Sequence, residues 1–226
     1  MSQFEVPVDL HKELNPKIWE NNQVKTPVNI ALLKIAKEYY DFLGINVPIV
    51  DVVVSGSQAN YNYSEHSDLD LHLIVPYSKV QCDMAVDQLF DTKRKLWKEQ
   101  HTLNIYGIPV ELYAEDVETP AVSSTYSLLK QKWIKPPATP EVNFDEDEIA
   151  RISLIWIRVI TGALKTQDLE QCQQVKELLW KYRKVGLAKD GEMGTPNLVF
   201  KALRNSDITK LLLDAVRHLE DQSLSI

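Results

Sequence analysis

The sequence predicts an α+β protein, in which a small domain with a mixed β-sheet is followed by a C-terminal helical domain. Three observations predict it. Short β-branched or alternating runs occur between residues 49 and 114, with helical patterns before and among them. A segment rich in proline and acidic residues follows at 136–148, and its composition is that of a linker. Beyond it, apolar residues recur at helical spacing, so we expect one domain at residues 1–140, opened by N-terminal helices, and a helical one at 141–226.

Length, charge and cysteine content narrow the class of protein. The 226 residues are enough for one large domain or two small ones, at roughly 100–200 residues each. The chain has 25 Lys and Arg against 32 Asp and Glu, a net charge of −7. Because proteins that neutralise duplex phosphates usually have a basic excess, we expect no long groove for duplex nucleic acid. Only Cys82 and Cys172 are present, which argues against a disulfide framework and a cysteine zinc site.

The expected location is the cytoplasm. The first residues lack the apolar core of a signal peptide, and no run approaches the roughly 18 apolar residues of a membrane span. Two cysteines 90 positions apart fit a reducing compartment. We therefore expect no membrane partner.

The N-terminal segment is predicted to be helical. A short helical stretch is expected near residues 15–20. A stronger helix follows, with Thr26 as its N-cap, Pro27 at its first helical position and apolar residues at alternating four- and three-residue steps up to Phe42. Gly44 is expected to end it.

The sheet is predicted from four short runs. A valine-rich strand is expected at 49–54, ending at a Ser-Gly-Ser turn, and a second strand at 69–75. Residues 79–100 have an amphipathic pattern that would cover one face of the sheet. Two further strands, at 102–106 and 110–114, flank a glycine and a proline in a hairpin signature. This order is too interrupted for a Rossmann repeat, and neither GxGxxG nor GxxxxGK[ST] occurs.

The stretch that indicates chemistry is Gly56-Ser57, then nine residues, then Ser67-Asp68-Leu69-Asp70. Side chains alternate along a strand, so Asp68 and Asp70 are expected on one face and the intervening leucines on the other. Two carboxylates this close repel each other and raise each other's pKa, unless a cation lies between them. Oxygen ligands of this kind suit Mg²⁺ or Mn²⁺. A solvated edge strand is the alternative interpretation.

A third carboxylate and a phosphate turn complete the predicted site. Glu111 is the candidate carboxylate, because its two apolar neighbours would face the core. Three carboxylates on adjacent strands form a two-metal site, in which one ion holds a nucleotide triphosphate and the other activates an attacking hydroxyl. Gly56 permits a sharp turn close to a phosphate, and Ser57 can add its hydroxyl. His72 shares this strand face, either bonded to a carboxylate or ligand or as an ordinary half-buried histidine.

This combination of strand-Gly-Ser, Ser-Asp-x-Asp-Leu and a later apolar-Glu-apolar strand resembles the DNA polymerase beta-type nucleotidyltransferase superfamily. Over residues 56–63 and 67–72, the sequence is similar to uncharacterised nucleotidyltransferases that tailed bacteriophages frequently encode. The resemblance covers about residues 49–116, with a weaker similarity at 186–188 and 197–201. It implies a mixed-sheet catalytic domain with a helical domain behind it, and transfer of a nucleoside monophosphate from a nucleoside triphosphate, with ATP as the expected nucleotide. A phage-encoded chain would work in the host cytoplasm.

Carried over position by position, the resemblance makes Gly56 and Ser57 the phosphate-binding turn. Asp68 and Asp70 become the first two ligands of two Mg²⁺ or Mn²⁺ ions, and Glu111 becomes the third carboxylate. All three carboxylates are thus candidate catalytic residues and metal ligands. The third carboxylate of the superfamily is more frequently Asp, so Glu111 is a departure from its pattern.

The helical part adds candidate cations for a triphosphate. Between residues 176 and 217 there are nine basic residues against five acidic ones, a net charge of +4. Enzymes of the resembled superfamily often take triphosphate contacts from their helical domain. The candidate nucleotide-binding cations are Lys181, Lys184, Lys201 and Arg204. An ordinary solvated helix face is the alternative for each.

These observations lead to one hypothesis and one rival. The hypothesis is a metal-dependent nucleotidyltransferase that transfers a nucleoside monophosphate from an NTP to an acceptor hydroxyl and releases pyrophosphate. The acceptor classes left open are a nucleotide or RNA end, a protein hydroxyl, and a small molecule such as an aminoglycoside. The rival is a non-catalytic protein on the same fold that senses a nucleotide or acts as an antitoxin-like interaction partner.

Overall fold

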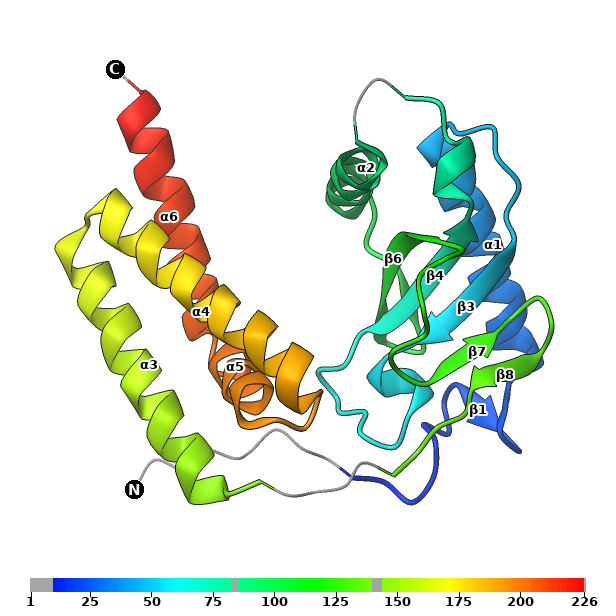
Figure 1. Ribbon diagram of the computed structural model, residues 1–226, viewed down its shortest axis with the longest axis horizontal. Coiled ribbons are helices and arrows are strands. Elements are labelled where there is room, and N and C mark those ends of the chain that lie inside the picture. The colour runs from blue at the N-terminus through cyan, green and yellow to red at the C-terminus, as the bar shows by residue number, and fades with distance from the viewer. Residues whose placement is uncertain (1–9, 83–84, 140–143, 226) are drawn as a thin grey trace. The chain divides into compact units, whose positions relative to one another are not determined.

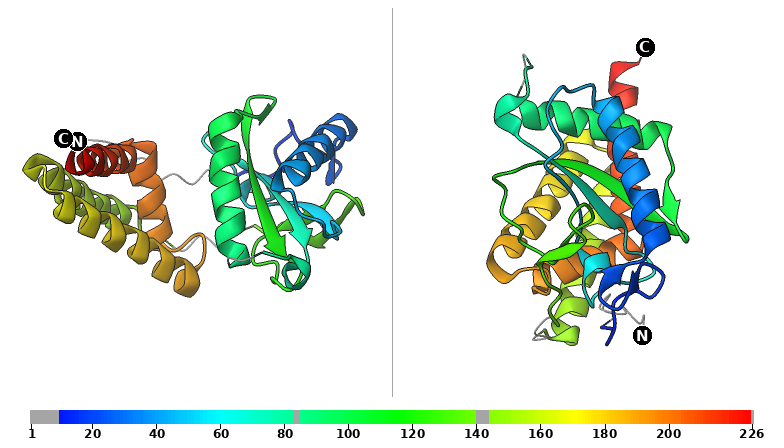
Figure 2. Two further views of the ribbon diagram at one scale, coloured as in Figure 1. Left: turned by 90° about the horizontal axis from the view of Figure 1, so that it is seen from above. Right: turned by 90° about the vertical axis from the view of Figure 1, so that its right-hand side faces the viewer.

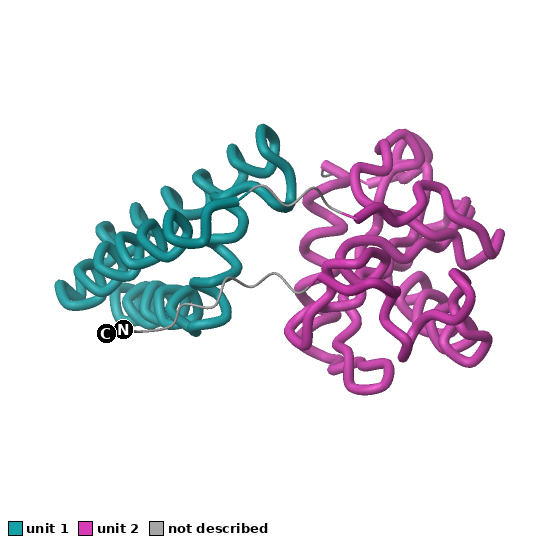
Figure 3. The backbone as a smooth tube through the Cα atoms, turned by 90° about the horizontal axis from the view of Figure 1, so that it is seen from below, with its two compact units in different colours: residues 1–8, 140–226 teal, residues 9–139 magenta. Residues whose placement is uncertain are grey.

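The computed structural model describes residues 10–82, 85–139 and 144–225. The chain divides into two compact units, here called the α/β unit (residues 9–139) and the helical unit (residues 140–226 with 1–8), which Figure 3 colours separately. The prediction of a mixed α/β protein with a mixed sheet and helices is confirmed.

The α/β unit is a six-stranded sheet with two helices and a small hairpin (Figure 1). In chain order its elements are β1 (Trp19–Glu20), β2 (Gln23–Val24), α1 (Thr26–Leu43), β3 (Asp51–Ser55), η1 (Ser57–Ala59), β4 (Leu69–Val75), η2 (Tyr77–Lys79), α2 (Val86–Gln100), β5 (Asn104–Ile105), β6 (Ile108–Asp116), β7 (Thr125–Ser127) and β8 (Lys132–Lys135). The strand order in the sheet is β5-β6-β4-β3-β7-β8. Only β4 and β6 run parallel, and α2 lies in the crossover that a parallel pair requires.

One face of this sheet is apolar and carries both helices. Along β4 buried and half-buried residues alternate, which confirms the predicted period of two. Tyr39 of α1 and Trp97 of α2 meet over the buried face, with ring centroids 5.3 Å apart, so the two helices share one core. The other face presents half-buried polar side chains such as Asp70 and His72. The polar face is therefore the side of the sheet on which a catalytic site can lie.

The N-terminal prediction is partly wrong. Instead of a short helix, residues 15–20 form a turn followed by β1, the first strand of the β1–β2 hairpin. Asn21 and Asn22 both adopt positive φ, 50° and 59°, as a tight two-residue hairpin turn requires, and asparagine tolerates this well. The next helix occurs where predicted and ends at Gly44 in the left-handed conformation, but its N-cap is Lys25 and not Thr26.

The helical unit consists of α3 (Glu146–Thr166), α4 (Leu169–Asp190), α5 (Thr195–Asn205) and α6 (Ile208–Leu224). Figure 2 shows α3 and α4 side by side. Asp145 and Asp168 cap α3 and α4 by accepting hydrogen bonds from backbone amides three residues later. Leucines and other apolar residues from all four helices form a separate core. Among the described helices, none combines the length and apolar character needed to cross a membrane.

Candidate active site

Strand register places two of the predicted carboxylates, Asp70 and Glu111, in one row on the polar face of the sheet. Ser55, the last residue of β3, lies opposite Asp70 on β4, and Asp70 lies opposite Glu111 on β6. Neighbouring strands are about 4.8 Å apart, and partners in register project to the same face. The fold therefore brings Asp70, Glu111 and the turn that follows Ser55 together.

Gly56 packs directly against one of these carboxylates. Its φ of 75° and ψ of −157° lie in a region that essentially only glycine occupies. A Cβ atom at this position would lie closer than 3 Å to Asp70 Oδ2. The backbone then enters the short helix η1, in which the amide of Ala59 donates to the Gly56 carbonyl at 3.1 Å. The predicted phosphate turn and the predicted metal ligand are thus in contact.

Gln58 holds this turn in place, a role that sequence reasoning missed. It is almost fully buried, and its Nε2 donates to the Ser67 carbonyl at 3.2 Å, next to Asp68. Its Oε1 accepts from Asn15 Nδ2 at 2.9 Å, and its backbone carbonyl accepts from Trp19 Nε1 at 2.7 Å. Gln58 therefore connects the turn, the segment before β4 and the N-terminal hairpin. In sequence it looks like any polar turn residue.

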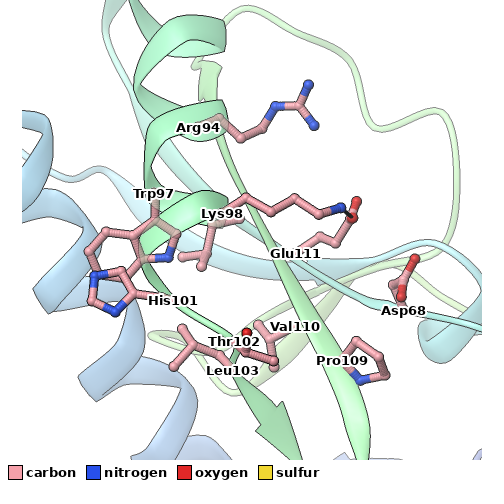
Figure 4. A pocket seen from close by; sticks show the side chains of 11 residues that line it. Asp68, Arg94, Trp97, Lys98, His101, Thr102, Leu103, Pro109, Val110 and Glu111 are labelled. Atoms are coloured by element: carbon pink, nitrogen blue, oxygen red, sulfur yellow. Dashed lines mark hydrogen bonds and ion pairs between the residues drawn. The ribbon is translucent and has the colours of Figure 1, made fainter. Parts of the chain in front are cut away.

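Glu111 faces the polar side, as predicted, and both of its carboxylate oxygens have partners. Lys98 of α2 donates to Oε1 (Figure 4). The Tyr113 hydroxyl donates to Oε2 at 2.7 Å. Burial alone would raise the pKa of Glu111, but the hydrogen bonds from Lys98 and Tyr113 and the positive charges of Lys98 and Arg94 lower it below its ordinary value. Burial also raises the pKa of Tyr113, and the nearby negative charges of Asp70 and Glu111 add to this effect.

The three predicted metal ligands supply suitable donors but are not gathered as a preformed cage. Within residues 10–82, 85–139 and 144–225, no three His, Cys, Asp or Glu side chains cluster as a metal site. Asp68 lies just before β4 and lines a pocket together with Glu111 (Figure 4). Carboxylate oxygens on a half-buried face fit Mg²⁺ or Mn²⁺. A metal ion at Glu111 would compete with Lys98 for the negative charge of this carboxylate.

Both ring nitrogens of the half-buried His72 have hydrogen-bond partners, neither of which is one of the three predicted carboxylates. Its Nδ1 lies 3.0 Å from Glu115 Oε2, and its Nε2 lies 3.0 Å from Ser55 Oγ. The ring also stacks on Tyr113, with centroids 4.8 Å apart. These contacts hold Ser55 in place next to Gly56, at one end of the row of polar residues.

The four candidate cations of the helical unit have different surroundings. Lys181 and Lys184 are exposed on α4. Lys201 on α5 is half-buried, and burial lowers its pKa; the positive charges of Arg204 and Arg183 act in the same direction, and Glu192 opposes them. Lys201 and Arg204 therefore share a basic cluster with Arg183, which was not predicted. Arg183 also lies over the ring of Phe200 and donates to Asn197 Oδ1 at 3.2 Å.

Comparison with known proteins adds no relative. No family model, curated protein or solved structure matches this chain. The assignment of function therefore depends on the residues and their geometry.

Proposed function

We propose that this chain is a metal-dependent nucleotidyltransferase that transfers a nucleoside monophosphate from an NTP, with ATP expected, to an acceptor hydroxyl. The observation that carries the proposal is the row formed by the Gly56 turn, Asp70 and Glu111 across three adjacent strands. Phosphate binding needs a close approach of backbone, which the glycine turn permits. Divalent ions need oxygen ligands, which the carboxylates supply.

Each residue has a defined role in this proposal. The turn at Gly56 and Ser57 binds the triphosphate, and Asp68, Asp70 and Glu111 are the residues that would hold two Mg²⁺ or Mn²⁺ ions. Bound ions would neutralise the phosphates and acidify the acceptor hydroxyl. The acceptor oxygen forms a bond to the α-phosphorus while the bond from that phosphorus to the bridging oxygen breaks. Pyrophosphate leaves, and Glu111 accepts the proton of the acceptor.

The test is transfer of label from each α-labelled NTP, with Mg²⁺ or Mn²⁺ and a cell extract as the source of acceptors. We expect a labelled product with the wild-type protein and none with Asp68→Ala or Asp70→Ala, because each variant lacks a ligand. Glu118→Gln is the matched control, since Glu118 is an exposed acid beyond β6 and should leave transfer unchanged.

The outcomes separate the enzyme from its rival. Full activity in a folded Asp68→Ala protein would contradict the mechanism. NTP binding without turnover under all conditions would favour the non-catalytic sensor or antitoxin-like protein instead. Circular dichroism checks that both variants are folded, which we expect because Asp68 and Asp70 lie outside the apolar core.

A further inference from the structure

A pocket beside Glu111 has the charge and shape features of an acceptor site. It lies between α2 and the start of β6 and has a volume of about 190 Å³. Asp68 and Glu111, two of the proposed catalytic carboxylates, are part of its lining (Figure 4). Any group bound there lies next to the proposed reacting centre.

The position of this pocket sets it apart from the phosphate turn. In the strand order, Gly56 follows β3 on one side of Asp70, whereas β6 and α2 lie on the other side. The strand β5 pairs only with Ile108 and Pro109, and α2 packs on β6, so side chains of α2 can reach Glu111 past the edge of β6. The triphosphate and the pocket are thus on opposite sides of the carboxylates, as a donor and an acceptor need to be.

The lining combines an apolar part with cations. Trp97, Leu103 and Val110 give it apolar surface, while Arg94 and Lys98 extend from α2 in the same direction (Figure 4). Drug-sized ligands usually occupy about 300–1,000 Å³, so this pocket suits a single ring-sized fragment. A ring with an adjacent anion matches these features.

Helix α2 contributes two cations, Arg94 and Lys98, to the lining of the pocket. Arg94 lies over the ring of Tyr113 at 5.1 Å and pairs with Asp91 at 2.8 Å, and Lys95 pairs with the same Asp91 at 2.7 Å. Arg94 and Lys95 therefore share one acid, Asp91, on this part of the helix, whereas Lys98 has its partner, Glu111, on β6. The carboxylates on the opposite wall are assigned to metal ions in the proposed function, which leaves the cations for an anionic ligand.

We infer that the acceptor is a nucleoside unit with a 5′-phosphate, whose ring occupies this pocket and whose phosphate binds Arg94 and Lys98. This inference rests on the proposed nucleotidyltransferase function and selects among its acceptor classes. A cationic aminoglycoside is disfavoured by the two basic side chains, and a serine or tyrosine hydroxyl of a protein brings no anion to them. Both a free 5′-mononucleotide and the 3′-terminal unit of an oligonucleotide have the required chemistry.

The test compares acceptors with and without the phosphate. Transfer from labelled ATP would be measured to a nucleoside, its 5′-monophosphate, an oligoribonucleotide, an aminoglycoside and extract proteins. We expect kcat/KM for the phosphorylated acceptors to exceed that for the nucleoside on the order of 10- to 100-fold, the range for hydrogen bonds to a charged group. Whether the mononucleotide or the oligonucleotide is labelled faster identifies the source.

A matched pair of variants tests the role of the cation. Lys98→Gln should remove most of the preference for the phosphorylated acceptor, measured as the ratio of kcat/KM for the 5′-monophosphate to that for the nucleoside within the same variant, so that an effect through Glu111, which both acceptors share, cancels. Lys95→Gln is the control, because both lysine side chains are 69% exposed on α2 and Lys95 does not line the pocket. A preference that survives in Lys98→Gln, or that falls equally in both variants, overturns the inference.

The acceptor assignment and the proposed nucleotidyltransferase function can be refuted separately. Label on a protein or an aminoglycoside, with none on nucleotides, overturns the acceptor assignment and leaves the nucleotidyltransferase proposal standing. No labelled product with any acceptor overturns the proposed function, and the acceptor assignment with it.

Discussion

Replacing Gly56 by alanine should separate the site from the stability of the fold. The backbone at Gly56, with φ 75° and ψ −157°, lies in a region that costs other residues about 1–3 kcal/mol. The added Cβ would also meet Asp70 Oδ2 closer than 3 Å. That oxygen ends a flexible side chain, so Asp70 can rotate away at little further cost in stability. The rotation, however, removes a proposed metal ligand from its place.

Gly107→Ala is the control for the backbone cost alone. Gly107 also has a positive φ, 84°, but no atom lies within 4 Å of an added Cβ. Each variant should lower the free energy of unfolding by about 1–3 kcal/mol, or Tm by roughly 2–4 °C per kcal/mol in a chain of this size. Only Gly56→Ala should also lower kcat/KM for nucleotidyl transfer, on the order of 100-fold, since small misplacement of a reacting group has effects of this size.

Calorimetry and the labelled-NTP assay on both variants measure the two quantities separately. Near-wild-type transfer by a folded Gly56→Ala protein would refute the reasoning, because it would mean that the contact between the turn and Asp70 is irrelevant to the site. An equal loss of transfer in Gly107→Ala would refute it as well, since that substitution acts only on the turn between β5 and β6.

Two further predictions concern the stability of the two units. Gly162→Ala should stabilise the helical unit by about 0.5–1 kcal/mol, because alanine is the better helix former and nothing lies within 4 Å of its Cβ. Gly186→Ala, the same change in α4, should instead destabilise it by about 1–3 kcal/mol, because its Cβ would collide with the ring of Pro196; urea midpoints that shift in the same direction would contradict this. Burial raises the pKa of Tyr39 to about 12, so the native state keeps a proton that the unfolded chain loses near pH 10. Stability should therefore fall by up to ~2–3 kcal/mol from pH 10 to 12, and Tyr39→Phe should abolish this part of the fall. At neutral pH this variant should be at least as stable, because the hydroxyl has no hydrogen-bond partner among the described residues, and an unchanged alkaline profile in the variant would count against it.

Local chemistry explains which parts of the fold were predictable. The strand at 69–75 was predicted with its bounds, because leucines and polar residues alternate with the period of a strand and a proline follows. The glycine that ends α1 was predictable for a similar reason. β7 and β8 were missed because strands of three and four residues are too short for a period to show. Tertiary hydrogen bonds, such as that from Trp133 Nε1 to the Asn22 carbonyl, hold this edge of the sheet.

The candidate site was likewise predictable from the sequence only in part. Residues on the strands could be assigned to the polar face from alternation alone, as for Asp70 and Glu111. Partners from elsewhere in the chain could not, because they depend on how distant elements pack. Lys98 reaches Glu111 only because α2 lies along β6, and Gln58 is buried only because the N-terminal hairpin covers it. Amphipathic spacing predicts which face of a helix is buried, but not which strand its polar residues will meet.

The contact between Lys98 and Glu111 links metal binding to acceptor binding within the proposed mechanism. A divalent ion bound to Glu111 would offset the negative charge of this carboxylate, so metal ligation weakens its attraction for Lys98. The ammonium is on a flexible stem and already lines the pocket proposed for the acceptor phosphate. Conversely, a phosphate that draws Lys98 away leaves Glu111 with unbalanced charge, which strengthens its affinity for a cation. By linkage the two effects are equal in free energy, so Mg²⁺ and a phosphorylated acceptor should each increase the affinity for the other. Lys98→Gln should weaken this coupling, because the side chain that exchanges between the two partners has lost its charge.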